Sequence, residues 1–401
     1  MPDYQSSAVR HVWKMYFEGP WPVAIAFAGS SRRLVAGNQD GTILEWELPE
    51  VPTPGKVLGE DNKETDGFVP PQPKRSYVGH TNTVTHLVAT AEATKIWSSS
   101  LDRTLAVWDL NAPNAGEVEI VLDGETRTRL AKYADEKKRR EVLDAPPVKM
   151  PTATPAATLA DHQDWIAALG VSRNGQRVIS GDDSGRVIVW DAASRQKAGS
   201  WQCPGVAWVA AVALSADGQT AAVSQYRRKG GDFNNYPAGL RIYSVADGSV
   251  QLDILATLYP KEKNPPYQYQ YEYHEFVAEG LVALAFSPDG KLLAAGQGGE
   301  GGNGKIHFVE TATGKLVRSV AGHKYGVTDL LFNTDGKYLF SAGRDTRWRI
   351  TRVEDGAEVA LIGKERGGQF TDWLAAIALS PDELRLAAAD IGGFVQVWDL
   401  A

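Results

Sequence analysis

Histidine, serine and aspartate recur in this sequence at a spacing that could support nucleophilic catalysis. One such set is His80, Ser98 and Asp102, and the same three residue types recur at the same intervals from His323. In a hydrolase triad the carboxylate orients the imidazole, which takes a proton from the serine hydroxyl. The same three types can instead form a buried hydrogen-bond network, because an imidazole inside a protein needs an acceptor. The elements that carry these residues decide between the two interpretations.

Residues suited to metal binding are few. The chain has one cysteine, Cys203, and seven histidines. Three histidines fall at repeat positions and three in expected strands, which leaves His274 as the one in a clear loop. A multi-histidine metal site needs more than this, so we expect no metal and no cofactor. A site built from carboxylates alone, with Asp164 and Asp372 each preceding a tryptophan, stays open.

Self-similar segments organise the chain. Those that begin at Trp165, Trp208 and Trp373 contain alternating apolar runs separated by turns, a pattern typical of short antiparallel strands. Several turns end in Asp-Gly, which favours hairpins: Ser215–Gly218, Ser287–Gly290 and Asn333–Gly336. Seven units align at the end of their third strand, at Trp46, Trp108, Trp190, Tyr243, Phe308, Thr351 and Trp398.

The aligned units resemble the WD-repeat family of β-propellers. Trp-Asp closes three of them, at Trp108-Asp109, Trp190-Asp191 and Trp398-Asp399, and Gly-His precedes two, at Gly79-His80 and Gly322-His323. The resemblance covers nearly the whole chain. It implies an all-β fold in which residues 1–401 form a single seven-bladed propeller around a central channel. The seventh unit stops before a fourth strand, so we expect residues 9–17 to supply that strand and close the ring.

The resemblance also bears on the His/Ser/Asp sets. Blades of the family are often held by a His–Asp–Ser–Trp network, and the second unit matches it in full with His80, Ser98, Asp102 and Trp108. Thr351 stands where the sixth unit would have tryptophan, and Ser184 stands where the third would have aspartate. Because the sets recur at repeat positions, we favour the structural interpretation over the catalytic one.

Insertions interrupt the repeats on both faces of the expected ring. The bottom face carries residues 49–72, expected to form an irregular loop, and residues 111–156, in which residues 125–143 have a helical composition. The top face carries residues 227–239, 256–280 and 297–304. Gly299–Lys305 fits the start of a phosphate-binding loop, but Ile306 follows it and the segment joins two expected strands. We therefore expect no nucleotide there.

Aromatic side chains gather on the predicted top face. Aligned first strands place four tryptophans at one equivalent position near the channel mouth: Trp21, Trp165, Trp208 and Trp373. The segment "PPYQYQYEYHEF" alternates tyrosines, and an extended backbone would put Tyr267, Tyr269, Tyr271 and Tyr273 on one side. The neighbouring insertion adds Tyr226, Phe233 and Tyr236. Such rings either contact a partner or cover apolar blade edges; for the tyrosines we predict a recognition arm.

These features favour a non-catalytic scaffold that binds a protein or peptide on its top face. One alternative is a hydrolase-like enzyme at the channel mouth. Another is a propeller that binds nucleic acid through Arg227, Arg228, Lys229, Arg344, Arg347, Arg349 and Arg352, against which the net charge of -7 counts. The N-terminal residues contain no apolar signal region, and no 18-residue apolar run exists. We expect a cytoplasmic protein without membrane contact that is a monomer in isolation.

Overall fold

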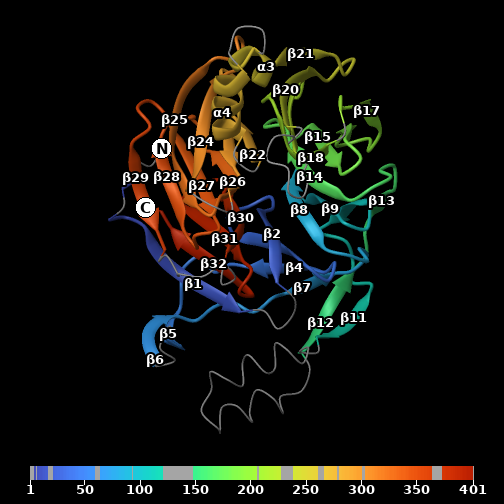
Figure 1. Ribbon diagram of the computed structural model, residues 1–401. Helices are drawn as coiled ribbons and strands as arrows, with labels where there is room; N and C mark the ends of the chain where they lie inside the picture. Colours follow the sequence, from blue (N-terminus) through green and yellow to red (C-terminus); the bar gives the residue numbers. More distant parts are fainter. Residues whose placement is uncertain are drawn as a thin grey trace.

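The chain forms a ring of seven blades around a central channel (Figure 1). The computed structural model describes residues 4–5, 7–16, 21–58, 64–92, 94–120, 148–205, 207–226, 238–260, 266–277, 280–299, 303–363 and 373–400. Each blade contains a four-stranded antiparallel meander, and the first strands of consecutive blades lie side by side around the ring. The expected seven-bladed all-β fold is confirmed.

In blades one to six the four strands of the meander run from the channel outward in chain order, whereas in blade seven the N-terminal strand lies outermost. Blades one to three contain β2 (Pro22–Phe27), β3 (Arg33–Asn38), β4 (Ile43–Glu47) and β7 (Arg75–Tyr77); β8 (Val84–Ala89), β9 (Lys95–Ser100), β10 (Leu105–Asp109) and β13 (Ala157–Leu159); and β14 (Ile166–Val171), β15 (Arg177–Asp182), β16 (Arg186–Asp191) and β17 (Lys197–Gln202). Blades four and five contain β18 (Trp208–Leu214), β19 (Thr220–Tyr226), β20 (Ala238–Ser244) and β21 (Val250–Asp253), then β22 (Leu281–Phe286), β23 (Leu292–Gln297), β24 (Asn303–Glu310) and β25 (Leu316–Lys324). Blades six and seven contain β26 (Val327–Phe332), β27 (Tyr338–Gly343), β28 (Trp348–Arg352) and β29 (Glu358–Ile362), then β30 (Leu374–Leu379), β31 (Arg385–Asp390), β32 (Phe394–Asp399) and β1 (Arg10–Tyr16).

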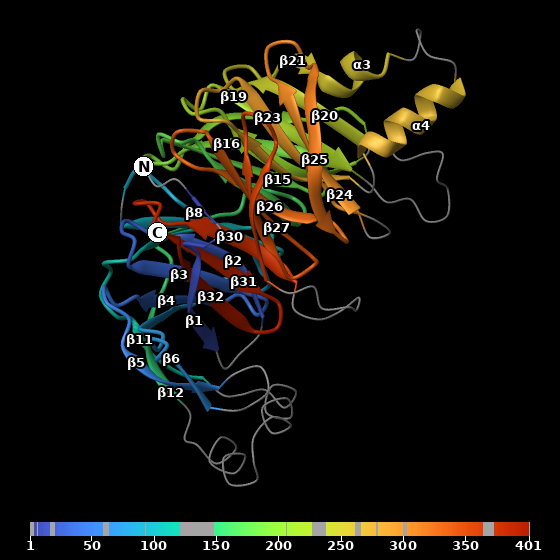
Figure 2. The same ribbon diagram turned by 90° about the vertical axis from the view of Figure 1, so that its left-hand side faces the viewer.

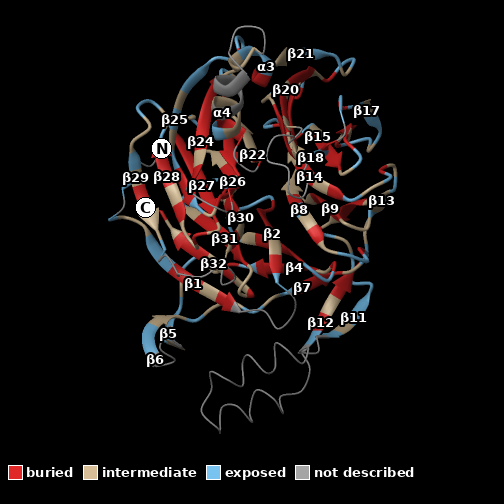
Figure 3. Cartoon of the chain, in the orientation of Figure 1, coloured by how far each residue is buried: buried red, intermediate tan, exposed pale blue. Residues whose placement is uncertain are grey.

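The core lies between neighbouring blades. The seven side chains aligned at the ends of the third strands are all buried, with Trp398 the most exposed at 6%. Buried residues concentrate on the inner strands, whereas outer strands such as β17 face solvent (Figure 3). Gly218, Gly290 and Gly336 in the Asp-Gly turns have positive φ angles of 71°, 72° and 74°, a conformation that glycine adopts at little cost. Local turn chemistry and the period of apolar residues therefore place the strands.

The N-terminal strand closes the ring as predicted. β1 pairs antiparallel with β32, and the register sets His11 opposite Trp398 and Met15 opposite Val395. Trp13 and Met15 are at most 1% exposed, so β1 contributes large apolar side chains to the core as well as backbone hydrogen bonds.

The bottom insertions contain more strand than the sequence suggested. Residues 49–72 do not form an irregular loop, because β5 (Pro54–Leu58) and β6 (Glu64–Phe68) pair as a hairpin. In residues 111–156, β11 (Gly116–Ile120) pairs with β12 (Val148–Ala153), which adds parallel to β7 and widens blade one to six strands. The helix expected at residues 125–143 lies outside the described residues. In Figure 2 these strands lie at the lower left, away from the helix α4 (Pro266–Val277) at the upper right.

Candidate interaction surface

The four aligned tryptophans occupy one equivalent position at the channel mouth. In six blades the backbone carbonyl of this residue accepts a hydrogen bond from the amide just after the second strand, at 2.9–3.1 Å: Gln39 to Trp21, Leu101 to Thr83, Asp183 to Trp165, Gly298 to Gly280, Arg344 to Gly326 and Ile391 to Trp373. In blade four, Trp208 pairs directly with Tyr226 across β18 and β19. The alignment made from the sequence is therefore right, and the structure brings these positions onto a single face.

Solvent exposure separates three of the indoles from the fourth. Trp21, Trp165 and Trp208 are 39%, 52% and 42% exposed. Trp373 is only partly exposed, and the guanidinium of Arg344 lies 4.9 Å from its ring centre. Packing between blades leaves part of these three large apolar side chains exposed at the channel mouth, so they are available for contact. Trp373 is instead held by a cation–π contact within the protein.

The tyrosine segment is helical, so the predicted one-sided stripe is wrong. Residues Pro266–Val277 form α4, which follows the short helix α3 (Ile254–Leu258) in the connection between blades four and five. Successive residues of a helix turn by about 100°, and residues two apart therefore point to different sides. Proline at the first helical position favours this start, since its missing N–H has no intrahelical partner in any case. The side chains of Tyr267, Tyr269 and Tyr271 lie outside the described residues.

The C-terminal half of α4 is anchored to blade five. The Phe276 ring stacks on His307 at 4.1 Å, and Phe276 and Val277 are buried. Three polar side chains fix the helix end. The Gln297 amide donates to the carbonyls of Glu275 and Phe276 at 2.7 Å, His307 Nε2 donates to the Phe276 carbonyl at 3.1 Å, and Lys305 pairs with Glu275 at 2.7 Å. Burial lowers the pKa of His307 to about 4, which keeps its ring neutral at physiological pH.

Tyr273 belongs to this anchor. Its hydroxyl donates to the Ala238 carbonyl at 3.2 Å, and its ring packs edge-on against Tyr259. Tyr273 therefore packs against the propeller itself. Tyr226 lies beside the same connection, because a Cβ added at Gly280 would come within 2.7 Å of its ring. Phe233 and Tyr236 lie outside the described residues.

Lys305 also belongs to the sequence Gly299–Lys305, whose pattern matched a phosphate-binding loop. The segment joins the strands β23 and β24, as predicted, and its lysine is paired with Glu275. No helix N-terminus follows it to supply amides to a phosphate.

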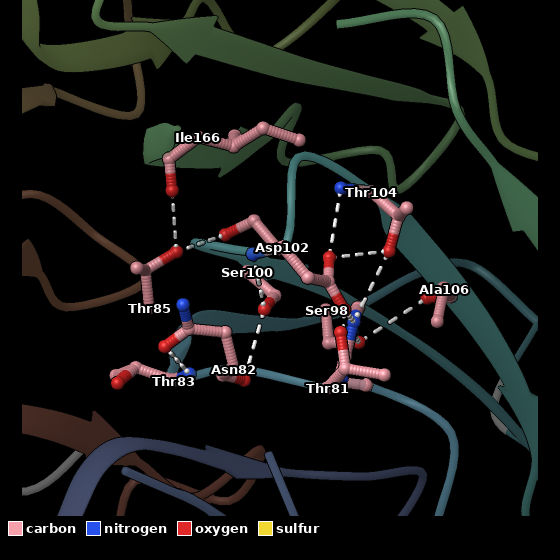
Figure 4. Close-up of polar contacts among 12 residues, drawn as sticks. Thr81, Asn82, Thr83, Thr85, Ser98, Ser100, Asp102, Thr104, Ala106 and Ile166 are labelled. Atoms are coloured by element: carbon pink, nitrogen blue, oxygen red, sulfur yellow. Dashed lines mark hydrogen bonds and ion pairs between the residues drawn. The ribbon is translucent and has the colours of Figure 1, made fainter. Parts of the chain in front are cut away.

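Each His/Ser/Asp set forms a hydrogen-bond network within its blade. His80 Nδ1 lies 2.8 Å from Asp102, His80 Nε2 lies 2.7 Å from Ser98, and the Trp108 indole donates to the same serine at 2.8 Å. Figure 4 shows Asp102 and Ser98 with their polar contacts. Ser98 is fully buried, so its hydroxyl cannot reach a substrate. The sixth blade repeats the arrangement, with His323 bound to Asp345 at 2.9 Å and to Ser341 at 2.8 Å.

The third blade has a complete network, which the sequence comparison missed. Its carboxylate comes from Asp182, two residues after Ser180, and lies 2.7 Å from His162 Nδ1. Ser184, which aligns with Asp102, instead donates to Asp182 at 2.6 Å. The prediction that Ser184 replaces the acid was therefore wrong. Carboxylates at different backbone positions can occupy the same point in space. An alignment of the repeats by residue spacing does not reveal such a replacement.

Two ionisable side chains lie on innermost strands where five blades have alanine. Every first strand bulges near its start, and the residue after the bulge is Ala24, His86, Ala168, Ala211, Ala283, Asp329 or Ala376. His86 is accessible to water but enclosed by the ring, and this burial lowers its pKa to about 4. Asp329 accepts the Ile377 amide of blade seven at 2.9 Å, just as Thr85 donates to the Ile166 carbonyl of blade three at 2.8 Å (Figure 4). Such contacts satisfy backbone groups on the unpaired inner edges.

Asp329→Asn should stabilise the protein in a pH-dependent way. Burial raises the pKa of Asp329 to about 6, above the ordinary 3.8, so this group favours the folded state below pH 4 and that contribution is lost as pH rises through 6. Asparagine keeps an acceptor for the Ile377 amide and has no charge. At pH 8 the variant should be about 1–3 kcal/mol more stable in urea unfolding than wild type, with little difference at pH 4. If the variant and wild type differ in unfolding free energy by the same amount at pH 4 and pH 8, the charge of Asp329 is not the cause.

Among the described arginines considered for nucleic-acid binding, Arg344, Arg349 and Arg352 each contact another side chain of the protein. Two of these arginines lie on β28, where Arg349 pairs with Glu358 of β29 at 2.8 Å and Arg352 pairs with Asp355 of the following turn at 2.7 Å. Arg344 lies over Trp373 on the top face. The cluster from Arg227 to Lys229 lies outside the described residues.

Metal binding, membrane-spanning helices and the cysteine can also be examined among the described residues. They contain no group of three or more histidine, cysteine, aspartate and glutamate side chains placed to bind a metal ion. Among their helices, none has the length and apolar character needed to cross a membrane. Cys203 is buried, and burial raises the pKa of its thiol.

Known proteins match the chain through its repeats. The repeat described as "WD domain, G-beta repeat" matches residues 71–109, 153–191, 268–308 and 314–351, which end at the third strands of blades two, three, five and six. WD repeat and SOCS box-containing protein 1 of Xenopus tropicalis is 34% identical over 116 residues, covering 29% of this chain and 26% of that protein. Autophagy-related protein 16 of Arabidopsis thaliana is 29% identical over 121 residues, covering 30% and 22% of the two chains.

A third relative aligns over a longer stretch. Eukaryotic translation initiation factor 3 subunit I of Candida glabrata is 26% identical over 207 residues, which is 49% of this chain and 52% of that protein. The matches thus span between about a quarter and a half of these relatives' lengths. Each matched stretch contains the first two strands of one blade and all or most of its third strand, and seven blades close into one ring. The chain is therefore a seven-bladed β-propeller that contains WD repeats.

Proposed function

We propose that this protein is a non-catalytic scaffold and that its top face binds a protein or a peptide. One observation carries the proposal: Trp21, Trp165 and Trp208 stand at equivalent positions around one channel mouth and are 39–52% exposed. Exposed tryptophans near the centre of a surface are the side chains that most often dominate binding energy. One relative is by name a subunit of an initiation factor, which supports a role in an assembly.

The rest of the surface offers a comparison. Val250, Leu316 and Val317 are exposed apolar residues too, at 47%, 39% and 47%. They lie on the outer strands β21 and β25, whereas the tryptophans surround the channel mouth. The N-terminal half of α4 extends beyond the ring (Figure 2), and we propose that it borders the binding surface together with Tyr226. A single, buried cysteine suits a reducing compartment, and we propose the cytoplasm as location.

The top face can be tested by removing two of its indoles. Trp165→Ser combined with Trp208→Ser should lower capture of partner proteins from the native host by at least about tenfold, because each lost aromatic anchor can cost about 2 kcal/mol or more of binding. The matched control is Leu316→Ser with Val317→Ser, which removes a similar apolar exposure from an outer strand. Quantitative mass spectrometry of affinity-purified material measures both, with melting temperatures recorded on the same preparations. Loss of partners in the control, with retention in the tryptophan variant, would move the binding surface elsewhere.

A further inference from the structure

At the rim of blade three, two aspartates contact the backbone of Trp165, whose indole is the most exposed of the top face. Asp164 immediately precedes Trp165 and accepts the Trp165 amide on Oδ1 at 2.9 Å. From the opposite turn, the Asp183 amide donates to the Trp165 carbonyl at 3.0 Å. Both aspartates are therefore held by backbone contacts to the residue whose indole is 52% exposed.

The same turn also lies beside the segment that precedes Trp208. Gly185 packs against the Ala207 carbonyl, which precedes Trp208, and the Gln202 amide donates to the Ser184 carbonyl at 2.7 Å. Asp183 is thus carried on a turn that packs against the segment leading into Trp208. We call Asp164, Trp165, Asp183 and Trp208 the blade-three rim.

The negative charge of this rim lacks a cation within the described part of the chain. Other aspartates near the ends of the same blade are paired: Asp161 with Lys197, and Asp191 with Arg177 at 2.7 Å. Neither Asp164 nor Asp183 forms an ion pair among the described residues. Burial, followed by the charges of Asp164 and Asp182, raises the pKa of Asp183 to about 6. Holding these carboxylates together costs stability, and such local costs are common at binding sites.

We propose that the blade-three rim binds an arginine or lysine side chain in an extended, basic segment of a protein partner. The apolar stem and the cationic group would lie on the Trp165 indole, which attracts cations through its π face. The charged group would meet Asp164 and Asp183, since charge-assisted hydrogen bonds to carboxylates are strong. A nucleic-acid backbone is disfavoured, because its phosphates would face the same carboxylates. The proposal rests on the proposed function, and it names the chemistry of the partner.

This chemistry links binding to pH. A bound cation stabilises ionised Asp183 and lowers its pKa, so the affinity should rise as pH increases through about 6 and level off near neutrality. The groups facing Asp183 from its own blade are Asp164 and Asp182, of which Asp182 is already bound to His162. The packed segment of blade four contributes the neutral Gln202 and the buried Cys203. The basic partner itself keeps its charge throughout this range.

The test uses short fluorescein-labelled peptides of alternating glycine and arginine, with glutamine or glutamate in place of arginine as charge controls. Fluorescence anisotropy at pH 5 and pH 7.5 follows their binding to the full chain. At pH 7.5, wild type should bind the arginine peptide about tenfold more tightly than the glutamine peptide. At pH 5, it should bind the arginine peptide less tightly than it does at pH 7.5. Asp183→Asn should remove most of this preference and the pH dependence. The control Asp217→Asn changes an exposed turn aspartate of blade four and should leave both intact.

The outcomes separate this proposal from the general one. Equal binding of the arginine, glutamine and glutamate peptides, no binding of any of them, or full binding by Asp183→Asn would overturn the cationic site. The peptide test can fail while the double variant Trp165→Ser with Trp208→Ser still loses its native partners. The scaffold function is then supported, and only the proposal of a basic partner is contradicted. If the tryptophan variant keeps its native partners, the top-face function fails whatever the peptides do.

Discussion

Removal of residues 1–16 should destabilise the whole propeller rather than one blade. This deletion takes away β1, and with it every interstrand hydrogen bond that β32 makes on its outer side. It also removes Trp13 and Met15, which lie in the core with β32 and blade one, and Tyr4, whose ring packs on Tyr338. Full burial of each large apolar side chain contributes about 1.5–3 kcal/mol, so the loss should reach about 5 kcal/mol or more. Such a loss equals the total stability of many domains.

Thermal unfolding followed by circular dichroism measures this effect directly. Truncated protein should melt at least about 10 °C lower or fail to fold at room temperature. Arg10→Ala is the control on the same strand: its partner is Asp399 at 2.7 Å, but Arg10 is largely exposed, and exposed ion pairs contribute about 1 kcal/mol or less. An unchanged melting temperature after truncation would mean that β1 does not hold the ring closed.

Asp182→Ala should have the second-largest effect, although no binding role is proposed for this residue. Its carboxylate binds His162 at 2.7 Å and accepts hydrogen bonds from the Ser184 hydroxyl, the Ser184 amide and the Arg186 amide at 2.6–3.0 Å. Alanine leaves a buried imidazole and two amides without this acceptor. Removing one partner of such a buried pair costs about 3–5 kcal/mol.

The control Ser184→Ala and a pH series make this prediction specific. Ser184 aligns with the aspartate of the second blade but only donates to Asp182, so its loss should cost about 1 kcal/mol. Burial raises the pKa of Asp182, but hydrogen bonds from His162, Ser184 and Arg186 outweigh it and set the pKa below 3.8. Because its pKa is lower in the folded protein, ionised Asp182 stabilises the fold at pH values above the ordinary pKa. That stabilisation is lost as pH falls through the pKa in the folded state. The difference in unfolding free energy between wild type and Asp182→Ala, measured with urea, should therefore become smaller in acid. Equal losses of stability in Asp182→Ala and Ser184→Ala would contradict the assignment of Asp182 as the main partner of His162.

Local chemistry in the sequence was sufficient to predict the ring. Alternating apolar residues and Asp-Gly turns fix strands and hairpins within about forty residues, and seven repetitions leave few other ways to bury them. The aligned third-strand ends are all buried, and β1 pairs with β32. The equivalent position of Trp21, Trp165, Trp208 and Trp373 was also predictable, because position within a repeat depends on register alone.

Contacts between distant segments decided the rest. The tyrosine segment forms a helix although its residues alternate; Phe276 and Val277 pack on blade five, and Gln297 and His307 satisfy the carbonyls at its end. The position of a carboxylate in space made Asp182, and not Ser184, the partner of His162. Pairing across insertions added β11 and β12 to blade one, which no local pattern specifies.

The candidate site shows the same division between local and tertiary information. The sequence determined where four indoles stand, because a repeat carries its own register. It could not determine which of them meet solvent: Arg344 from blade six lies over Trp373, while Trp165 stays open beside Asp164 and Asp183. Exposure depends on what neighbouring blades place over a side chain, and those neighbours are remote in sequence. For that reason the charge around Trp165, and the partner chemistry that we infer from it, became visible only in the tertiary structure.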